Sequence, residues 1–457
     1  MLDFKKKINS TLMKLSFILL FTLLQFTLTG QIQSITLSGH LINFPQKTYI
    51  QEISADVSIN PLNNKILIPS DSSGKFSMTL NIQKNGYYRI GRNILFLTVG
   101  NDLSMMLNYT DPKAAIFHGT EMEANNYLKS TPFPKMGSFI DGGEEIKLTF
   151  DSTINHIMSI VQKKKTLLGT FKNVPPHFKI MEYARIKADL INSIISLNYY
   201  YTDVLPRNSF SVFKKELDTK SPLILKKYAL NFFDSSYLSL EVYQDIVPTL
   251  IELSRSNTKN KIQRLAISDW LFTQKTIGKI AHEADKDTLT HLRNEIRKIK
   301  NKRYKEIVTA FQKNKLDFSN GKTAKDFTAI TNDNKRVFLK DFIGKVIYID
   351  LWATWCGPCL LEMPNFNKLK QQYKNNAEIV FLSISIDSER TKWKDYLQKV
   401  NAEGQQWIIN RADLSDYFVI DIPRYIIIKK DFTVFDLNAP APSASNIIKT
   451  LDSLIKE

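Results

Sequence analysis

Two cysteines separated by a glycine and a proline are the residues of this sequence best suited to chemistry. Cys356 and Cys359 are the only cysteines among the 457 residues, and they stand three positions apart. In the chain-entropy model a disulfide closing so short a ring contributes roughly 2 kcal/mol, against about 4.7 kcal/mol for a 100-residue loop. The pair therefore predicts reversible dithiol–disulfide chemistry and not a structural crosslink.

The surrounding residues predict how the cysteines would react. Val346 to Trp352 is a nearly continuous apolar run, typical of a buried strand, and Pro364 to Tyr373 has a helical pattern. Cys356 would then lie at the N-terminus of a helix, where free N–H groups and the helix dipole stabilise a thiolate. Cys356 would attack a disulfide, and Cys359, one turn along and more buried, would release the product. Pro358 is tolerated in a first helical turn.

Two carboxylates lie close to the cysteines in the sequence. Asp350 interrupts the apolar strand before Cys356, and Glu362 follows Cys359 by one helical turn. Carboxylates are uncommon inside apolar strands, and burial would raise the pKa of either group towards the range useful for proton transfer near neutral pH. We therefore expect Asp350 and Glu362 to take part in the exchange. The alternative is a solvated helix glutamate and a strand-end aspartate.

Other uses of a CxxC motif fit this sequence poorly. A structural zinc site takes four ligands, usually cysteine and histidine, but there is no second cysteine pair and all six histidines lie upstream. Covalent haem attachment needs a histidine after the second cysteine, where this chain has Leu360. A peroxiredoxin-type peroxidase remains a minor alternative, although its Pro/Thr context is missing before Cys356. We expect no metal and no small-molecule cofactor.

Length and charge limit the classes of protein to consider. A chain of 457 residues is longer than chains that fold around a single hydrophobic core, so we expect two or three domains. The formal net charge of +17 comes partly from the extreme N-terminus and partly from lysine-rich helices such as Lys298 to Arg303, which are typical of solvated helix faces. No nucleic-acid motif accompanies this charge, so we expect no nucleic-acid partner.

Residues 1–30 have the pattern of an export signal. Basic residues such as Lys7 and Lys14 precede an apolar run from Leu15 to Leu28, and Gly30 is a small residue at the point of cleavage. A membrane span needs about 20 apolar residues, so we expect a cleaved signal peptide, with an uncleaved anchor as the alternative. Export predicts a periplasmic location, in which disulfides form.

Three patterns follow the signal along the chain. Residues 31–120 contain short alternating runs between turn residues, as in Phe76 to Leu80, which predicts a small antiparallel β-sandwich-like domain. Residues 121–315 repeat apolar side chains at helical spacing, as in Ile180 to Ile195, and predict a helical region. Residues 316–457 alternate buried strands with helices, which predicts an α/β domain.

From Gly321 to Glu457 the sequence resembles the thioredoxin superfamily, specifically the TlpA/ResA-like group of exported thiol–disulfide oxidoreductases. The resemblance rests on the run Asp-Leu-Trp-Ala-Thr-Trp-Cys-Gly-Pro-Cys from Asp350, with Glu362 and Pro364 following. It implies a C-terminal thioredoxin fold, in which Asp350 helps to move the proton of the second thiol. Glu362 matches an acid characteristic of the ResA-like branch. Residues 31–120 resemble a β-rich domain found ahead of thioredoxin domains in Bacteroidetes-type exported proteins.

The resemblance also implies a substrate groove. The family places a cis-proline at Pro423, packed beside the cysteines, and Ile422 would offer its backbone to an extended substrate segment. Pro423 would also exclude metal from the dithiol pair. Trp355 and Pro358 would border the same docking surface. The residue before the Ile-Pro pair, usually glycine, is Asp421 here, which places a charge near the groove.

The sequence therefore predicts a periplasmic protein-disulfide reductase that exchanges electrons between its Cys356/Cys359 dithiol and the disulfides of partner proteins. The family adds a membrane thiol transporter as electron donor, and apocytochrome c cysteines or misoxidised proteins as targets. The alternative is an envelope binding protein in which the first 300 residues dominate and the redox domain is accessory. Loss of both cysteines would separate the two readings, because a binding protein would keep its activity.

Overall fold

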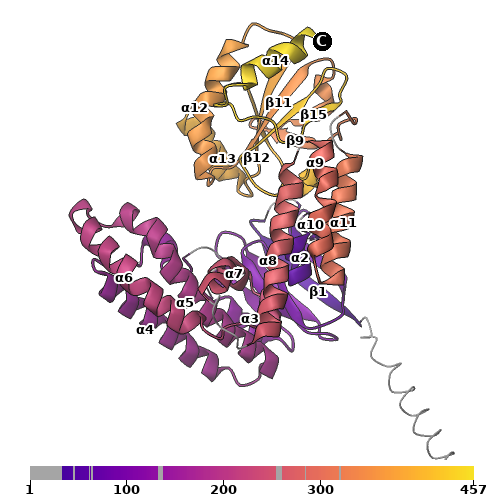
Figure 1. The fold of residues 1–457 in the computed structure, drawn as a ribbon. Coiled ribbons are helices and arrows are strands. Elements are labelled where there is room, and N and C mark those ends of the chain that lie inside the picture. Colours follow the sequence, from indigo (N-terminus) through magenta and orange to yellow (C-terminus); the bar gives the residue numbers. More distant parts are fainter. Residues whose placement is uncertain are drawn as a thin grey trace, which may run out of the picture.

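A computed structural model describes residues 33–44, 47–60, 62, 65–131, 137–253, 260–283, 285–318 and 321–457. The expected signal peptide, residues 1–30, lies outside this part of the chain. Within it, no helix is long and apolar enough to cross a bilayer. Figure 1 shows three regions in chain order, namely a β domain, a helical region and a C-terminal α/β domain.

The β domain consists of two four-stranded sheets, whose facing side chains, such as Leu37, Ile90 and Leu107, form one apolar cluster. This arrangement confirms the predicted sandwich, although β1 and β7 pair in parallel. The first sheet has the order β4-β1-β7-β8, with β1 (Gln33–Ile42), β4 (Lys75–Ile82), β7 (Leu103–Asn108) and β8 (Ile116–His118). The second has the order β3-β2-β5-β6, with β2 (Tyr49–Ile53), β3 (Lys65–Leu67), β5 (Gly86–Ile90) and β6 (Asn93–Leu97). Short helices are α2 (Ala55–Ile59) and η1 (Pro112–Ala114).

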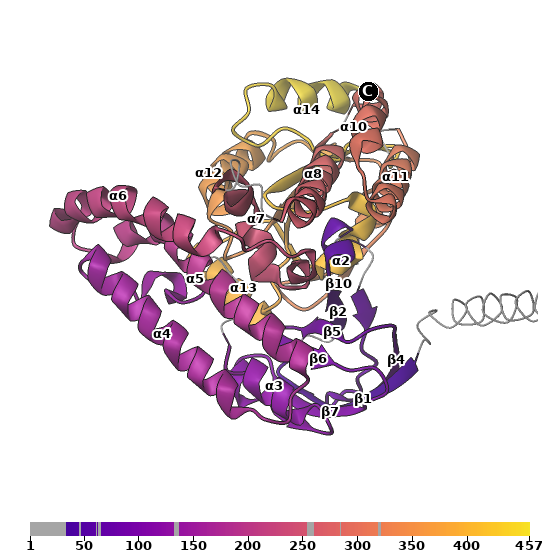
Figure 2. The same cartoon turned by 60° about the horizontal axis from the view of Figure 1, so that its bottom comes forward.

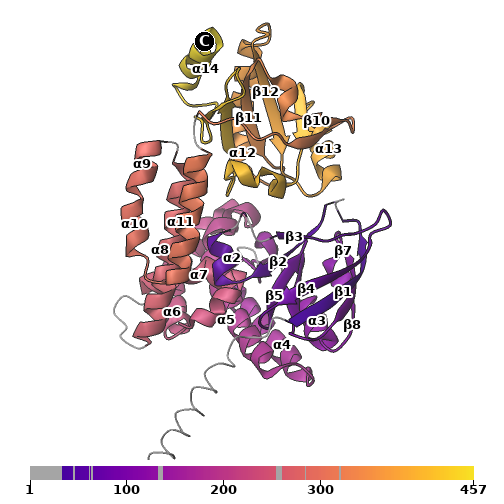
Figure 3. The same ribbon diagram turned by 90° about the vertical axis from the view of Figure 1, so that its right-hand side faces the viewer.

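The middle of the chain is helical, as predicted. Figure 1 shows α4, α5 and α6 projecting to one side, and Figure 2 shows the same projecting helices from below. Figures 1 and 3 show α8 and α11 lying alongside the β domain and reaching the C-terminal domain at one end. The elements are α3 (Met122–Leu128), η2 (Asp141–Gly143), α4 (Phe150–Thr170), α5 (Pro176–Val204), η3 (Arg207–Ser209), α6 (Phe210–Ala229), η4 (Ser235–Ser239), α7 (Glu241–Leu253), α8 (Lys261–His282), α9 (Lys286–His291), α10 (Arg293–Lys298) and α11 (Lys302–Asp317).

A buried charge network on α5 joins the helical region to the β domain. The Arg185 guanidinium donates to Glu182 and Asp189, each at 2.8 Å, one turn before and after it on the helix. The Tyr87 hydroxyl of β5 donates to the second Glu182 oxygen at 2.8 Å. Buried charges are costly unless they are paired, so removal of one member of this network would leave another buried charge without its partner. The contact between Tyr87 and Glu182 links the two regions.

The C-terminal domain is built on a seven-stranded sheet of order β10-β9-β13-β12-β11-β14-β15. The inner strand β11 runs parallel to β12 and antiparallel to β14. The elements are β9 (Thr328–Thr331), β10 (Arg336–Phe338), η5 (Leu339–Phe342), β11 (Val346–Trp352), α12 (Gly357–Gln372), β12 (Ile379–Ser385), α13 (Arg390–Lys399), β13 (Gln405–Ile408), η6 (Arg411–Tyr417), β14 (Arg424–Ile428), β15 (Val434–Asp436) and α14 (Ile447–Lys456).

Helices cover both faces of this sheet, which explains the continuous apolar run of β11. Successive side chains of a strand point to opposite faces. Tyr348 joins the cluster formed by α12 and α14, whereas Ile349 joins the cluster that includes Trp393 of α13. All seven residues of β11 are therefore buried. The predicted α/β layer fold of the C-terminal region is confirmed.

Candidate functional site

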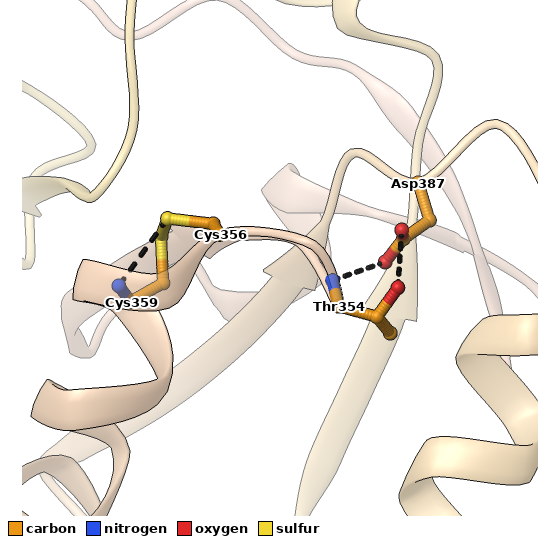
Figure 4. Close-up of a disulfide and its surroundings, with 4 residues drawn as sticks. All are labelled: Thr354, Cys356, Cys359 and Asp387. Atoms are coloured by element: carbon orange, nitrogen blue, oxygen red, sulfur yellow. Dashed lines mark hydrogen bonds between the residues drawn. A yellow bond between two sulfur atoms is a disulfide. The ribbon is translucent and has the colours of Figure 1, made fainter. Parts of the chain in front are cut away.

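The buried strand β11 leads through a short loop into α12 and places Cys356 at the N-cap of that helix. The backbone of Cys356 is extended, with φ −89° and ψ 94°, and its Sγ accepts a hydrogen bond from the Cys359 N–H at 3.2 Å. Figure 4 shows this contact beside the sulfur–sulfur bond. This N–H group and the dipole of the helix N-terminus favour a thiolate at Cys356.

Cys356 and Cys359 form a disulfide, with their Cα atoms 5.3 Å apart. Both residues are buried, at 5% and 3% exposure. The expectation that Cys359 is the more buried cysteine thus holds only by a small margin. Pro358 lies in the first turn of α12, where it removes no helical hydrogen bond. Trp355 next to the disulfide is 65% exposed, whereas Trp352 is completely buried.

Asp350 is a buried acid at the middle of the sheet. Its side chain is on the β11 face that α12 covers, and the residue is only 4% exposed. Burial, and then the negative charge of Glu362, raises the pKa of Asp350 to about 8. Glu362 lies on α12, where its oxygens accept from the Ser443 N–H at 3.2 Å and the Ser443 hydroxyl at 2.8 Å. The charge of Glu362 therefore acts on Asp350, and we call the two residues the acid pair.

The predicted groove residues Ile422 and Pro423 lie between η6 and β14. The Ile422–Pro423 peptide bond is cis, as expected from the resemblance. Ile422 packs against a large hydrophobic cluster that extends from the β domain to the C-terminal domain. In the described part of the chain, no group of three or more histidine, cysteine or acidic side chains is placed to hold a metal ion.

Comparison with known proteins agrees with this geometry. Residues 319–444 match the family described as Redoxin. The C-terminal region is a Redoxin domain. Over 112 residues the chain is 30% identical to the thiol-disulfide oxidoreductase ResA of Bacillus thuringiensis subsp. konkukian, a match that covers 24% of this chain and 64% of ResA. The chain thus spans slightly less than two thirds of that relative.

Two further similarities each cover about a third of the chain. The thioredoxin-like protein YneN of Bacillus subtilis is 24% identical over 147 residues, which cover 32% of this chain and 86% of YneN. A crystal structure of a putative thiol-disulfide oxidoreductase from Bacteroides vulgatus is 40% identical, with 30% of this chain and 98% of that chain covered and a TM-score of 0.29.

Asp421 of the Redoxin domain is held by the helical region, which the sequence did not predict. One Asp421 oxygen accepts from Arg424 at 2.9 Å, and the other lies 2.8 Å from Nε2 of His282, the last residue of α8. Arg424 is 1% exposed and also donates to the Ala281 carbonyl at 3.2 Å. The charge expected in the groove is therefore tied to α8. His282 gave no local sequence signal, because its partner lies far along the chain.

Asp387 of the Redoxin domain fixes the loop before the cysteines. Its carboxylate accepts from the Thr354 N–H at 2.9 Å and from the Thr354 hydroxyl at 2.8 Å (Figure 4). The Ser385 hydroxyl donates to the same carboxylate at 2.7 Å. A sequence signal for Asp387 did exist, because this residue directly follows the apolar run from Ile379 to Ile386. Strands β11 and β12 are parallel and end at the same sheet edge, so the pattern could have placed Asp387 near the loop after β11.

Proposed function

We propose that this protein is a thiol–disulfide oxidoreductase that exchanges two electrons between its Cys356/Cys359 pair and disulfides of partner proteins. The observation that carries the proposal is the Cys356–Cys359 disulfide at the N-cap of α12, with the buried acid Asp350 in the adjoining strand. The Redoxin match and the names of the relatives support the same chemistry.

In the proposed reaction the reduced protein starts as a dithiol. The Cys356 thiolate attacks one sulfur of the substrate disulfide, forms a mixed disulfide and releases the first substrate thiolate. The Cys359 thiolate then attacks Cys356 Sγ, releases the second substrate thiolate and forms the disulfide seen in the structure. Two electrons pass from the protein to the substrate, and a dithiol donor must restore them.

The acid pair supplies a route for the proton of Cys359. Burial raises the pKa of Asp350 to about 8, close to that of a thiol, so the ionised fraction of Asp350 is basic enough to accept the Cys359 proton and pass it to solvent. Glu362 adds to this basicity, because its negative charge also raises the pKa of Asp350. We assign proton transfer to Asp350 and a positioning role to Glu362.

We further propose that the protein is an exported, periplasmic reductase. Residues 1–30 supply the signal, and the Gly-Pro dipeptide between the cysteines resembles reducing members of the superfamily. A membrane thiol transporter would be the electron donor, and apocytochrome c cysteines or misoxidised proteins the targets. Trp355, Pro358, Ile422 and Pro423 would form the docking surface. The division at residues 31–120, 121–315 and 316–457 remains part of this proposal.

The test is a trapping experiment with matched cysteine variants. Reduced Cys359→Ser should accumulate a mixed disulfide with an oxidised protein substrate, whereas Cys356→Ser should accumulate none, because only Cys356 starts the exchange. The wild-type pair should equilibrate with glutathione or dithiothreitol buffers near the thioredoxin potential of about −270 mV. A value near −120 mV would make the protein an oxidant. Absence of any dithiol–disulfide transition would refute the enzymatic proposal and favour the binding protein.

A further inference from the structure

A cleft of about 1060 Å³ separates the β domain from the Redoxin domain. One wall is formed by β2, β3 and β5, and the other by β9, β10 and the loops after β12 and β13. Figure 3 shows β2 and β3 facing the side of the Redoxin domain on which β10 and α13 lie. We call this space the interdomain cleft.

Polar contacts between the walls set the width of the interdomain cleft. The Lys47 ammonium of the β domain lies 3.0 Å from an Asp413 oxygen, and the Asn410 amide donates to the Lys47 carbonyl at 3.3 Å. The hydroxyls of Tyr109 and Ser388 form another hydrogen bond across it. The two walls are therefore held by direct bonds, and the space between them is a preformed feature of the fold.

Positive charge dominates the lining. Six lining residues are basic and three are acidic, and each of the three acids is already engaged. Asp413 pairs with Lys47, Glu389 pairs with Lys392 at 2.9 Å, and Asp387 accepts from Thr354 and Ser385. The lining acids thus have little capacity left to neutralise the remaining cations.

Four lining cations, from both walls, have no carboxylate within 4.0 Å in the described part of the chain. These cations are Lys65, Arg336, Arg390 and Arg411. The Arg390 Nε is buried without a hydrogen-bond acceptor, although Nη2 of the same group donates to the Thr331 carbonyl at 3.1 Å. Burial, with the positive charges of Arg411 and Arg89, lowers the pKa of Lys65 to about 8. The Arg411 guanidinium already donates to the Val419 and Ile420 carbonyls and is attracted by Asp421, so Lys65, Arg336 and Arg390 carry most of the positive charge that the lining leaves unneutralised. A preformed space with such an excess of positive charge is suited to an anionic ligand.

The size and position of the cleft indicate which anion it fits. Small-molecule sites have about 300–1,000 Å³, so this space is slightly larger than that range and accommodates an extended ligand with several negative groups. Asp387 lines the cleft and also holds Thr354, two residues before Cys356. Asp387 therefore connects the lining of the cleft to the loop that carries the disulfide. Lining aromatic side chains, Phe44, Tyr49 and Tyr109, suit a polypeptide better than an inorganic ion.

We propose that the interdomain cleft binds an acidic segment of the polypeptide whose disulfide is exchanged at Cys356. This inference rests on the proposed function and adds the substrate class. The basic side chains would pair with aspartate and glutamate of the segment, while the substrate disulfide reaches the neighbouring redox site. Recognition of the substrate would then be shared between the β domain and the Redoxin domain.

The test compares two synthetic peptides on the full chain, pre-reduced with dithiothreitol and desalted. Both contain the same internal disulfide, followed after a spacer of four or eight residues by either Glu-Asp-Glu-Asp or Gln-Asn-Gln-Asn. In single turnovers at low salt, the acidic peptide should react about tenfold faster at subsaturating concentration and saturate at lower concentration. The preference should shrink as salt screens the charges. Lys65→Gln and Arg336→Gln should each reduce the preference for the acidic peptide. Lys84→Gln should preserve it, because Lys84 is an exposed lysine of the β domain that does not line the cleft.

A second measurement separates failure of this inference from failure of the proposed function. The Cys356→Ser/Cys359→Ser variant cannot exchange electrons, and its binding to a fluorescent acidic peptide without cysteine reports on the cleft alone. Lys65-dependent binding supports the inference even when neither disulfide peptide is reduced. Equal reaction of the acidic and neutral peptides in both spacer lengths overturns it. So does Lys65-dependent binding of inorganic phosphate without binding of the acidic peptide, which would make the cleft a small-anion site.

Discussion

Substitution of Glu362 by glutamine separates the two causes that raise the pKa of Asp350. Ionising a carboxyl whose pKa is shifted from 3.8 to about 8 costs about 6 kcal/mol more than in a model peptide. Burial is the larger cause and the charge of Glu362 is the smaller one. Glu362→Gln should therefore remove less than half of this cost, about 3 kcal/mol at most, so that Asp350 still titrates above about pH 6.

The assay is a pH titration of the oxidised protein labelled with ¹³C at the aspartate carboxyl carbons. Asp350→Asn identifies the resonance, because it removes the carboxyl carbon that is expected to titrate near pH 8 in the wild type. Glu378→Gln is the matched control, since Glu378 lies in the same domain and pairs with Lys430 at 3.0 Å. A Glu362→Gln titration identical to that of the wild type, or one at the ordinary aspartate value, would refute the reasoning.

The same carboxyl should make stability depend on pH. Because the folded pKa is raised, the unfolded chain releases this proton at lower pH than the folded protein does. The contribution of Asp350 to the free energy of unfolding is fully present below about pH 4. It falls by about 1.36 kcal/mol per pH unit until about pH 8. Hydrogen exchange of the central strands should show this decline in the wild type and a flatter profile in Asp350→Asn.

Three further substitutions test other parts of the structure. Arg185→Ala should destabilise the protein by about 3–5 kcal/mol, measured as loss of thermal stability, because it leaves two buried carboxylates unpaired. Trp355→Ala should change stability by less than about 0.5 kcal/mol while slowing reduction of a protein disulfide several-fold, since its side chain is exposed beside the disulfide. His282→Ala, compared with His291→Ala, should speed hydrogen exchange of the amides after Asp421, because that carboxylate loses its anchor on α8.

Each of these expectations can fail in a recognisable way. Normal stability of Arg185→Ala would mean that the α5 network is hydrated and contributes little. Unchanged kinetics of Trp355→Ala would remove the exposed indole from the docking surface. Equal exchange in the two histidine variants would show that α8 covers the cis-proline loop without restraining it.

The C-terminal fold was predictable because its signals are local. Val346 to Trp352 is apolar except for Asp350 because both sheet faces are covered, and the cysteine motif after it marks the start of a helix. Asp350 was recognisable as the one charge in that run. These features depend on neighbours in sequence, so pattern and resemblance together predicted both the element and the site.

The contacts between regions were not predictable from such signals. Arg424 reads as the start of a strand, yet its guanidinium bonds Ala281, 143 positions away. Asp421 was expected to place a negative charge near the groove, whereas in the structure its carboxylate pairs with His282 and Arg424. Likewise, the cations that line the interdomain cleft come from different regions of the chain. Lys65 and Arg336 line the same cleft although they lie far apart in the sequence.

The attachment of α8 to the loop before β14 bears on how this protein can be dissected. Arg424 finds two of its partners, Ala281 and His282, outside the Redoxin domain, and Phe418 packs its ring 5.3 Å from that of Phe311 on α11. In a fragment beginning at residue 321, the Arg424 guanidinium would lose these two partners and the Phe418 ring would lose its contact with Phe311. Potentials and substrate preferences measured on such a fragment would belong to a loop released from its support. The redox unit of this chain is therefore best defined to include α8 and α11.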